Sequence, residues 1–152
     1  MKAEFVNAFL EPAISVWGKE LGVELTFGEA EAVTGVFTTE DLTAIIGVTG
    51  KLKGNVFYEL SNGTAKTVAE AMCGMEFETM DEMALSAIGE LANMITGNAT
   101  TALAATNFVC DISPPVLLPR GASVTVSNPQ IRAHFTSSLG DMSIRVGLSE
   151  AA

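Results

Sequence analysis

One short stretch of the chain carries three polar side chains at spacings that bring them together on a helix. In "ALSAIGELANMITGNA", residues 84–99, Ser86, Glu90 and Asn93 are separated by four and then three positions. Side chains three and four positions apart are neighbours on an α-helix. A carboxylate and a carboxamide are costly to bury without partners. In so apolar a segment, these groups are either satisfied inside the protein or face outward for a reason.

A helical projection separates this stretch into an apolar face and a narrow polar stripe. With Ser86 at zero and about 100° per residue, Glu90 falls at about 40° and Asn93 at about −20°. Gly97 falls at about 20°, within the same stripe. The opposite face gathers Ala84, Ile88, Leu91, Ala92 and Ile95. We therefore expect the apolar face to lie in the core and the stripe to point away from it.

Two glycines, Gly89 and Gly97, lie beside or within the stripe. Inside a helix each glycine costs roughly 1 kcal/mol relative to alanine. Close approach of another group is the usual compensation, so we expect the surface around Ser86 and these glycines to contact a partner.

The side chains of the stripe are suited to orienting a reactant by hydrogen bonds. A carboxamide both donates and accepts hydrogen bonds, so Asn93 could orient a water molecule, although it has no basicity with which to remove a proton. Phosphoryl transfer depends on such positioning. The Glu90 carboxylate could pair with a cation of a substrate or partner. The alternative is that Glu90 and Asn93 simply form a solvated helix face.

The rest of the chain supplies the elements that must position this helix. Its 152 residues suffice for one domain, 1–152, with a proper core. Periodicity predicts helices and strands, while "PPVLLPRG" interrupts the pattern. The expected helices are 3–20, 64–74 and 81–106. The expected strands are 23–27, with a continuation toward Val36 left open, and 42–48, 54–60, 109–113, 122–127, 131–137 and 142–148, of which the last two form a β-hairpin.

This order suggests one unit used twice, in halves of about 1–75 and 76–152. The fold class we expect is α+β, with an antiparallel sheet and helices on one face.

Composition excludes several classes of function. The net charge of −10 disfavours nucleic acid and anionic membranes, which require clustered Lys and Arg. No apolar run is long enough to span a membrane, and the N-terminus does not resemble an export signal. Two cysteines are too few for a disulfide framework, and their apolar neighbours indicate reduced core residues of a cytoplasmic protein. The single histidine, His134, and the separated Cys73 and Cys110 do not form a metal-binding set.

The pattern Ser-x-x-x-Glu-x-x-Asn, here "SAIGELAN", resembles the signature of the CheC/CheX/FliY family of chemotaxis phosphatases. The stretches "KLKGNVFYELSNGTAKTVAEAMCGME" and "FVNAFLEPAISVW" are also similar to that family, and the chain looks most like its CheX branch. The family pattern continues with a proline. Pro115 falls one residue short of the family spacing and Pro114 two residues short, so both stay open, with Pro115 preferred.

The resemblance implies hydrolysis of the aspartyl phosphate of a CheY-like response regulator. It implies that Asn93 orients the attacking water and that Glu90 pairs with the regulator's lysine. It also implies that Mg²⁺ is supplied by the regulator, that the chain needs no cofactor of its own, and that the chain forms a homodimer by joining sheet edges. Aligning the two halves places Glu11 on Glu90 but Ile14 on Asn93, so we expect one active site per chain.

A second hypothesis stays open. The chain could be a non-catalytic binding or adaptor module of the flagellar-switch or two-component signalling type, because the wider superfamily includes such relatives.

Overall fold

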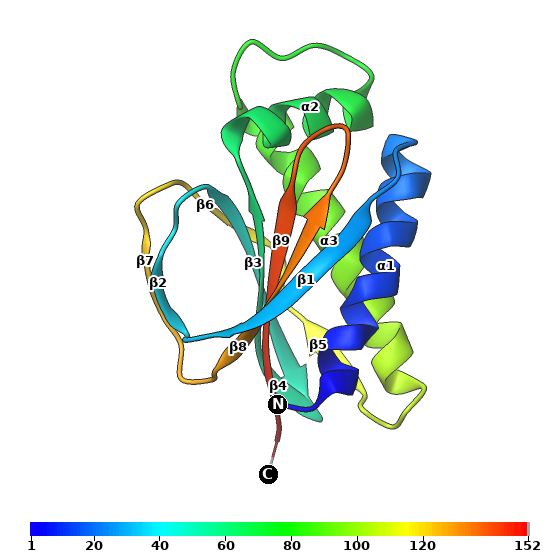
Figure 1. Ribbon diagram of the computed structural model, residues 1–152, viewed down its shortest axis with the longest axis vertical. Coiled ribbons are helices and arrows are strands. Elements are labelled where there is room, and N and C mark those ends of the chain that lie inside the picture. The colour runs from blue at the N-terminus through cyan, green and yellow to red at the C-terminus, as the bar shows by residue number, and fades with distance from the viewer. Residues whose placement is uncertain (152) are drawn as a thin grey trace.

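One antiparallel sheet organises the chain, and three helices cover one of its faces (Figure 1). The computed structural model describes residues 1–151. In spatial order the sheet consists of β1 (Thr26–Val33), β8 (Gln130–Thr136), β9 (Met142–Glu150), β4 (Leu52–Leu60), β3 (Leu42–Gly50) and β5 (Cys110–Ile112), and β6 (Val116–Leu118) also pairs with β3. A separate ribbon joins β2 (Val36–Thr38) to β7 (Ser123–Thr125). The expected α+β class is confirmed.

The three helices begin and end where the sequence supplies capping groups. They are α1 (Ala3–Leu21), α2 (Asn62–Cys73) and α3 (Glu82–Ala104). The Ser61 side chain accepts a hydrogen bond from the first turn of α2, and the Asp81 side chain does the same for α3. Gly74 ends α2 in the left-handed conformation that glycine adopts easily. The three expected helices are confirmed, and α1 continues through Pro12.

The core lies between the sheet and the helices. Alternate residues of each strand point into it, so Val56, Tyr58 and Leu60 of β4 are buried there. The helices contribute large side chains such as Phe9 and Trp17, which are 1 % and 0 % exposed. The expected shared face of β9 is confirmed, because Met142, Ile144, Val146 and Leu148 are all buried. β8 and β9 form the expected hairpin.

Several strand predictions were wrong in their bounds. The strand expected at 23–27 is β1, which begins only at Thr26 and runs on to Val33, along the continuation toward Val36 that the sequence left open. The interrupted segment "PPVLLPRG" contains β6, in which three residues between prolines pair with Thr43–Ile45 of β3. The strand expected at 122–127 is the short β7, whose partner β2 was not predicted. That the two halves are repeats stays a prediction.

The other face of the sheet carries a cluster of charged and aromatic side chains. Phe37 of β2 packs edge-on against Phe57, with ring centroids 5.3 Å apart. The Arg145 guanidinium lies 3.8 Å from the centre of the Phe37 ring. Glu59 accepts hydrogen bonds from Arg132 Nε at 2.9 Å and Arg145 Nε at 3.1 Å. These contacts attach the β2–β7 ribbon to the sheet on the side away from the helices.

Candidate active site on helix α3

Helix α3 presents the polar stripe outward. Its apolar face is fully packed, because Ala84, Ile88, Leu91, Ala92 and Ile95 are each no more than 2 % exposed. On the other face Ser86 and Glu90 are exposed and Asn93 is half-buried. Many apolar contacts thus fix the rotation of the helix about its axis, and that rotation directs the stripe to the surface. The expected orientation is confirmed.

Glu90 and Asn93 are not used by the fold. Within residues 1–151, the Glu90 carboxylate forms no ion pair and accepts no hydrogen bond from a side chain. The Asn93 carboxamide likewise has no hydrogen-bond partner among these residues. Both groups keep their full hydrogen-bonding capacity for water or for another molecule.

Gly89 is where another segment of the chain approaches the helix. A Cβ atom added there would lie 3.3 Å from Pro115 Cγ and 3.4 Å from Leu117 Cδ2. The absence of a side chain therefore allows β6 and the preceding proline to pack directly onto α3. The structure places Pro115 against Gly89, beside the polar stripe. It is the chain's own β6 segment that approaches Gly89.

Gly97 differs from Gly89. A Cβ atom added at Gly97 would meet nothing within 4 Å. Within residues 1–151, no side chain packs into the space that Gly97 leaves open. A benefit that offsets the helix-destabilising effect of this glycine therefore has to come from contact with another molecule.

A shallow pocket of about 300 Å³ lies beside Glu90, between α3 and β6. Its lining combines apolar and polar side chains: Glu82, Leu85, Ser86, Gly89, Glu90, Pro115 and Leu117. Sequence reasoning found four of these residues but missed Glu82, Leu85 and Leu117. Leu117 lies in the strand that the prolines concealed, so no periodic signal marked it.

A buried hydrogen bond joins the site helix to the sheet at Thr96, one turn after Asn93. The Tyr58 hydroxyl lies 2.7 Å from Thr96 Oγ1, and both side chains are almost completely buried. Thr96 Oγ1 donates to the Ala92 carbonyl at 2.8 Å, so the Tyr58 hydroxyl donates to Thr96. Burial raises the pKa of Tyr58 well above its usual range, which keeps that proton in place. The polar Thr96 on an apolar face is the one signal that could have revealed this pair.

The other candidate residues lie elsewhere. His134 of β8 is half-buried, with its Nδ1 atom 2.9 Å from Ser143 Oγ and its Nε2 atom 3.6 Å from Glu31. Within residues 1–151, no group of three or more His, Cys, Asp or Glu side chains is placed to hold a metal ion. Glu11 and Ile14 are exposed on α1. In the described part of the chain, no helix is long and apolar enough to cross a membrane.

An antiparallel sheet with helices on one face is the fold that this chain shares with solved proteins of the CheC-like class. A CheC-like superfamily protein from Shewanella sp. PV-4 superposes with a TM-score of 0.87 and 24 % identity, over 98 % of this chain and 99 % of that one. The family model for the chemotaxis phosphatase CheX matches residues 42–138. The chain therefore belongs to the CheX family of chemotaxis phosphatases.

Two relatives describe this family further. The CheY-P phosphatase CheX of Thermotoga maritima is 37 % identical over 119 residues, which make up 78 % of this chain and 77 % of the relative. The CheX component of a CheX–CheY–BeF₃–Mg²⁺ complex from Borrelia burgdorferi has a TM-score of 0.76 and 24 % identity, over 96 % of this chain and 98 % of that one. The resemblance noted in the sequence is confirmed, and so is the expected enzyme class, a phosphatase.

Proposed function

We propose that this protein hydrolyses the aspartyl phosphate of a CheY-like response regulator, with Glu90 and Asn93 as its working residues. The observation that carries the proposal is the pair itself. A carboxylate and a carboxamide one helical turn apart lie on an outward-facing stripe, and neither is used by the fold within residues 1–151. The Thermotoga maritima relative, 37 % identical, is a CheY-P phosphatase.

In the proposed reaction, Asn93 enters the phosphorylation site of the receiver domain. Its carboxamide oxygen accepts a hydrogen bond from a water molecule and holds that water in line with the aspartyl phosphate, so that the water attacks phosphorus and the aspartate carboxylate leaves. The group provides orientation and does not remove a proton. Such positioning is worth a large rate factor, because misplacement by about 1 Å costs about 100-fold.

Glu90 has a different role in the proposal. Its carboxylate forms an ion pair with the lysine of the receiver's active site, which fixes how α3 lies on the receiver. Mg²⁺ belongs to the receiver, in agreement with the composition of the Borrelia burgdorferi complex. Ser86, Gly97 and Pro115 belong to the contact surface around this pair.

Two further expectations accompany the proposal. Location in the cytoplasm stays a prediction, as does the homodimer. β1 ends the sheet and is exposed along most of its length, so its free edge is the place at which a second copy could extend the sheet. Sedimentation of the purified protein at two or more concentrations tests the dimer.

The decisive experiment measures the loss of phosphate from a phosphorylated CheY-like receiver with Mg²⁺ present. Wild-type protein is expected to accelerate the loss, and Asn93→Ala is expected to reduce the acceleration at least about 100-fold while still binding the receiver. If the receiver loses phosphate as fast with the Asn93→Ala variant as with the wild-type protein, the catalytic role of Asn93 is wrong. If wild-type protein binds the receiver without accelerating the loss, the adaptor hypothesis replaces the phosphatase.

A further inference from the structure

The pocket beside Glu90 contains a carboxylate to which the proposed reaction assigns no role. Glu82, in the first turn of α3, lines the pocket together with Glu90. Its side chain is exposed and forms no ion pair within residues 1–151. The first turn of a helix favours an acidic residue slightly, but that effect requires neither a pocket nor a second carboxylate beside it.

The walls of this pocket are apolar. Leu85 of α3 forms one side, and Pro115 and Leu117 form the other. Gly89 makes the pocket possible, because it lets the β6 segment come close enough to the helix to build that second wall. The result is a cavity of about 300 Å³ with hydrocarbon walls and two carboxylates in its lining.

The segment of the chain that supplies the pocket lining carries no cation. Between Lys66 and Arg120 the sequence contains no lysine, arginine or histidine. The same segment, which includes α3 and β6, contains seven acidic residues: Glu70, Glu76, Glu78, Asp81, Glu82, Glu90 and Asp111. The potential at the pocket is therefore negative, and a positively charged group of another molecule is attracted to it.

A lysine or arginine side chain matches this combination. Its hydrocarbon stem packs favourably on apolar surface while its charged head stays at the rim. In this pocket the stem would contact Leu85, Pro115 and Leu117, and the head would lie next to the Glu82 carboxylate.

We infer that this pocket receives a basic side chain of the receiver domain, distinct from the lysine proposed for Glu90, and that Glu82 is its partner. The inference rests on the proposed function, which places the receiver on this face of α3. The position of the basic residue follows from helix geometry. Glu82 precedes Asn93 by eleven residues, which is about 16 Å along the helix axis. The basic residue that pairs with Glu82 therefore lies roughly that far from the phosphorylated aspartate. Glu82 thus acts in the choice of receiver and not in the chemical step.

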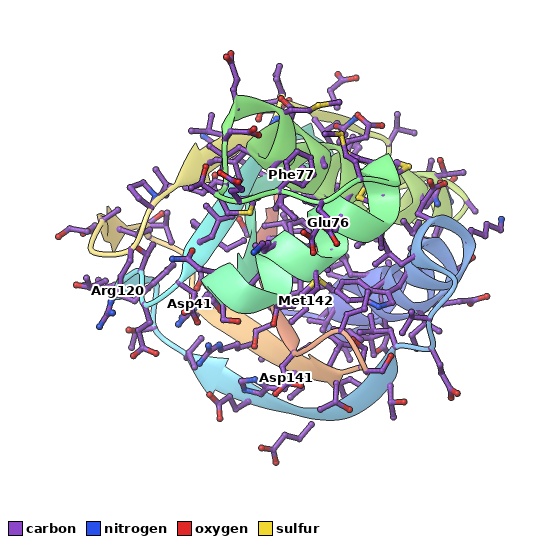
Figure 2. All side chains as sticks on the ribbon, turned by 90° about the horizontal axis from the view of Figure 1, so that it is seen from above. Asp41, Glu76, Phe77, Arg120, Asp141 and Met142 are labelled. Carbon is purple, nitrogen blue, oxygen red and sulfur yellow. The ribbon has the colours of Figure 1, made fainter. Side chains whose placement is uncertain are left out.

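The test compares two neutralised carboxylates with one another. Glu82→Gln removes the charge at the pocket. Glu76→Gln removes an equal charge from the connector between α2 and α3, on which Glu76 is labelled in Figure 2. Glu76 does not line the pocket. Binding to a CheY-like receiver is measured with BeF₃⁻ and Mg²⁺ at low and high salt. The rate of phosphate loss is measured at saturating receiver. Melting curves of both variants establish that they are folded.

Glu82→Gln is expected to weaken binding about fivefold at low salt and less at high salt, while the rate at saturation stays unchanged. Glu76→Gln is expected to change binding less than about twofold. If Glu82→Gln binds as tightly as wild type, or if both variants weaken binding equally, the pocket has no specific partner and the inference is wrong.

These results are distinguishable from failure of the proposed function. That failure appears in the wild-type protein, as no acceleration of phosphate loss, whatever Glu82 does. A second measurement identifies the partner residue. Each surface lysine and arginine of the receiver is replaced by alanine and combined with Glu82→Gln in a double-mutant cycle. One residue is expected to show coupling to Glu82, and additivity at every position would contradict the inference.

Discussion

Glu59 and Glu90 are two carboxylates of the same chain with opposite surroundings. Glu59, on the sheet face away from the helices, is 7 % exposed and accepts hydrogen bonds from Arg132 and Arg145. Glu90, on the outward face of α3, is exposed and has no cationic partner within residues 1–151. The fold thus pairs the buried Glu59 carboxylate with two arginines and leaves the exposed Glu90 carboxylate without a cation. The difference separates a group that maintains the structure from a group available to a second molecule.

The largest effect expected from this comparison is on stability. Glu59→Ala leaves the guanidinium groups of Arg132 and Arg145 without their carboxylate, and Arg145 is 9 % exposed. Removing one member of a buried ion pair costs about 3 kcal/mol, because the remaining charge stays desolvated. We expect urea unfolding to show a loss of that order. Phosphate loss per folded molecule is expected to remain at the wild-type rate.

The matched control is Glu59→Gln, which keeps a hydrogen-bond acceptor and is expected to lose less stability than Glu59→Ala. A loss below about 1 kcal/mol for the alanine variant would mean that the cluster is solvated, and that the contrast with Glu90 is one of position only.

The next effect is on binding. Glu90→Ala is expected to change the free energy of unfolding by less than about 0.5 kcal/mol, because an exposed helical position has little to lose. The affinity for a receiver held with BeF₃⁻ and Mg²⁺ is expected to fall about tenfold, because the receiver's lysine loses its partner. Calorimetric titration measures the affinity. An unchanged affinity together with an unchanged rate would remove Glu90 from the proposed site.

The site helix was the most predictable part of the molecule. Its apolar positions recur with the period of an α-helix, so the sequence alone determined which residues enter the core and that Ser86, Glu90 and Asn93 face outward. Its start was predicted to within one residue, at 81 against the observed Glu82, which Asp81 caps. The β8–β9 hairpin was predicted for the same reason, because alternation marks one buried face along each strand.

What escaped prediction depends on contacts between distant segments. β6 is three residues long and lies between prolines, so it has no pattern of its own and forms because β3 offers an edge with which to pair. The packing of Pro115 on Gly89 and the hydrogen bond between Tyr58 and Thr96 join segments more than twenty residues apart. The sequence indicated that Gly89 needed a close neighbour but not that the neighbour was β6.

The smallest expected effect concerns Gly97, and it tests whether this position of the stripe contacts the receiver. Gly97→Ala adds a methyl group where nothing within residues 1–151 lies closer than 4 Å, so the folded chain accommodates it. An alanine inside a helix is favoured over glycine by about 0.5–1 kcal/mol, and the melting temperature is expected to rise accordingly. Gly18→Ala in α1 is the matched control, because a Cβ atom there also meets nothing. Both variants are expected to be stabilised, but only Gly97→Ala is expected to weaken receiver binding, because the receiver's surface approaches the stripe there. Equal binding by the two variants would place Gly97 outside the contact surface and confine the receiver to the part of α3 around Ser86, Glu90 and Asn93.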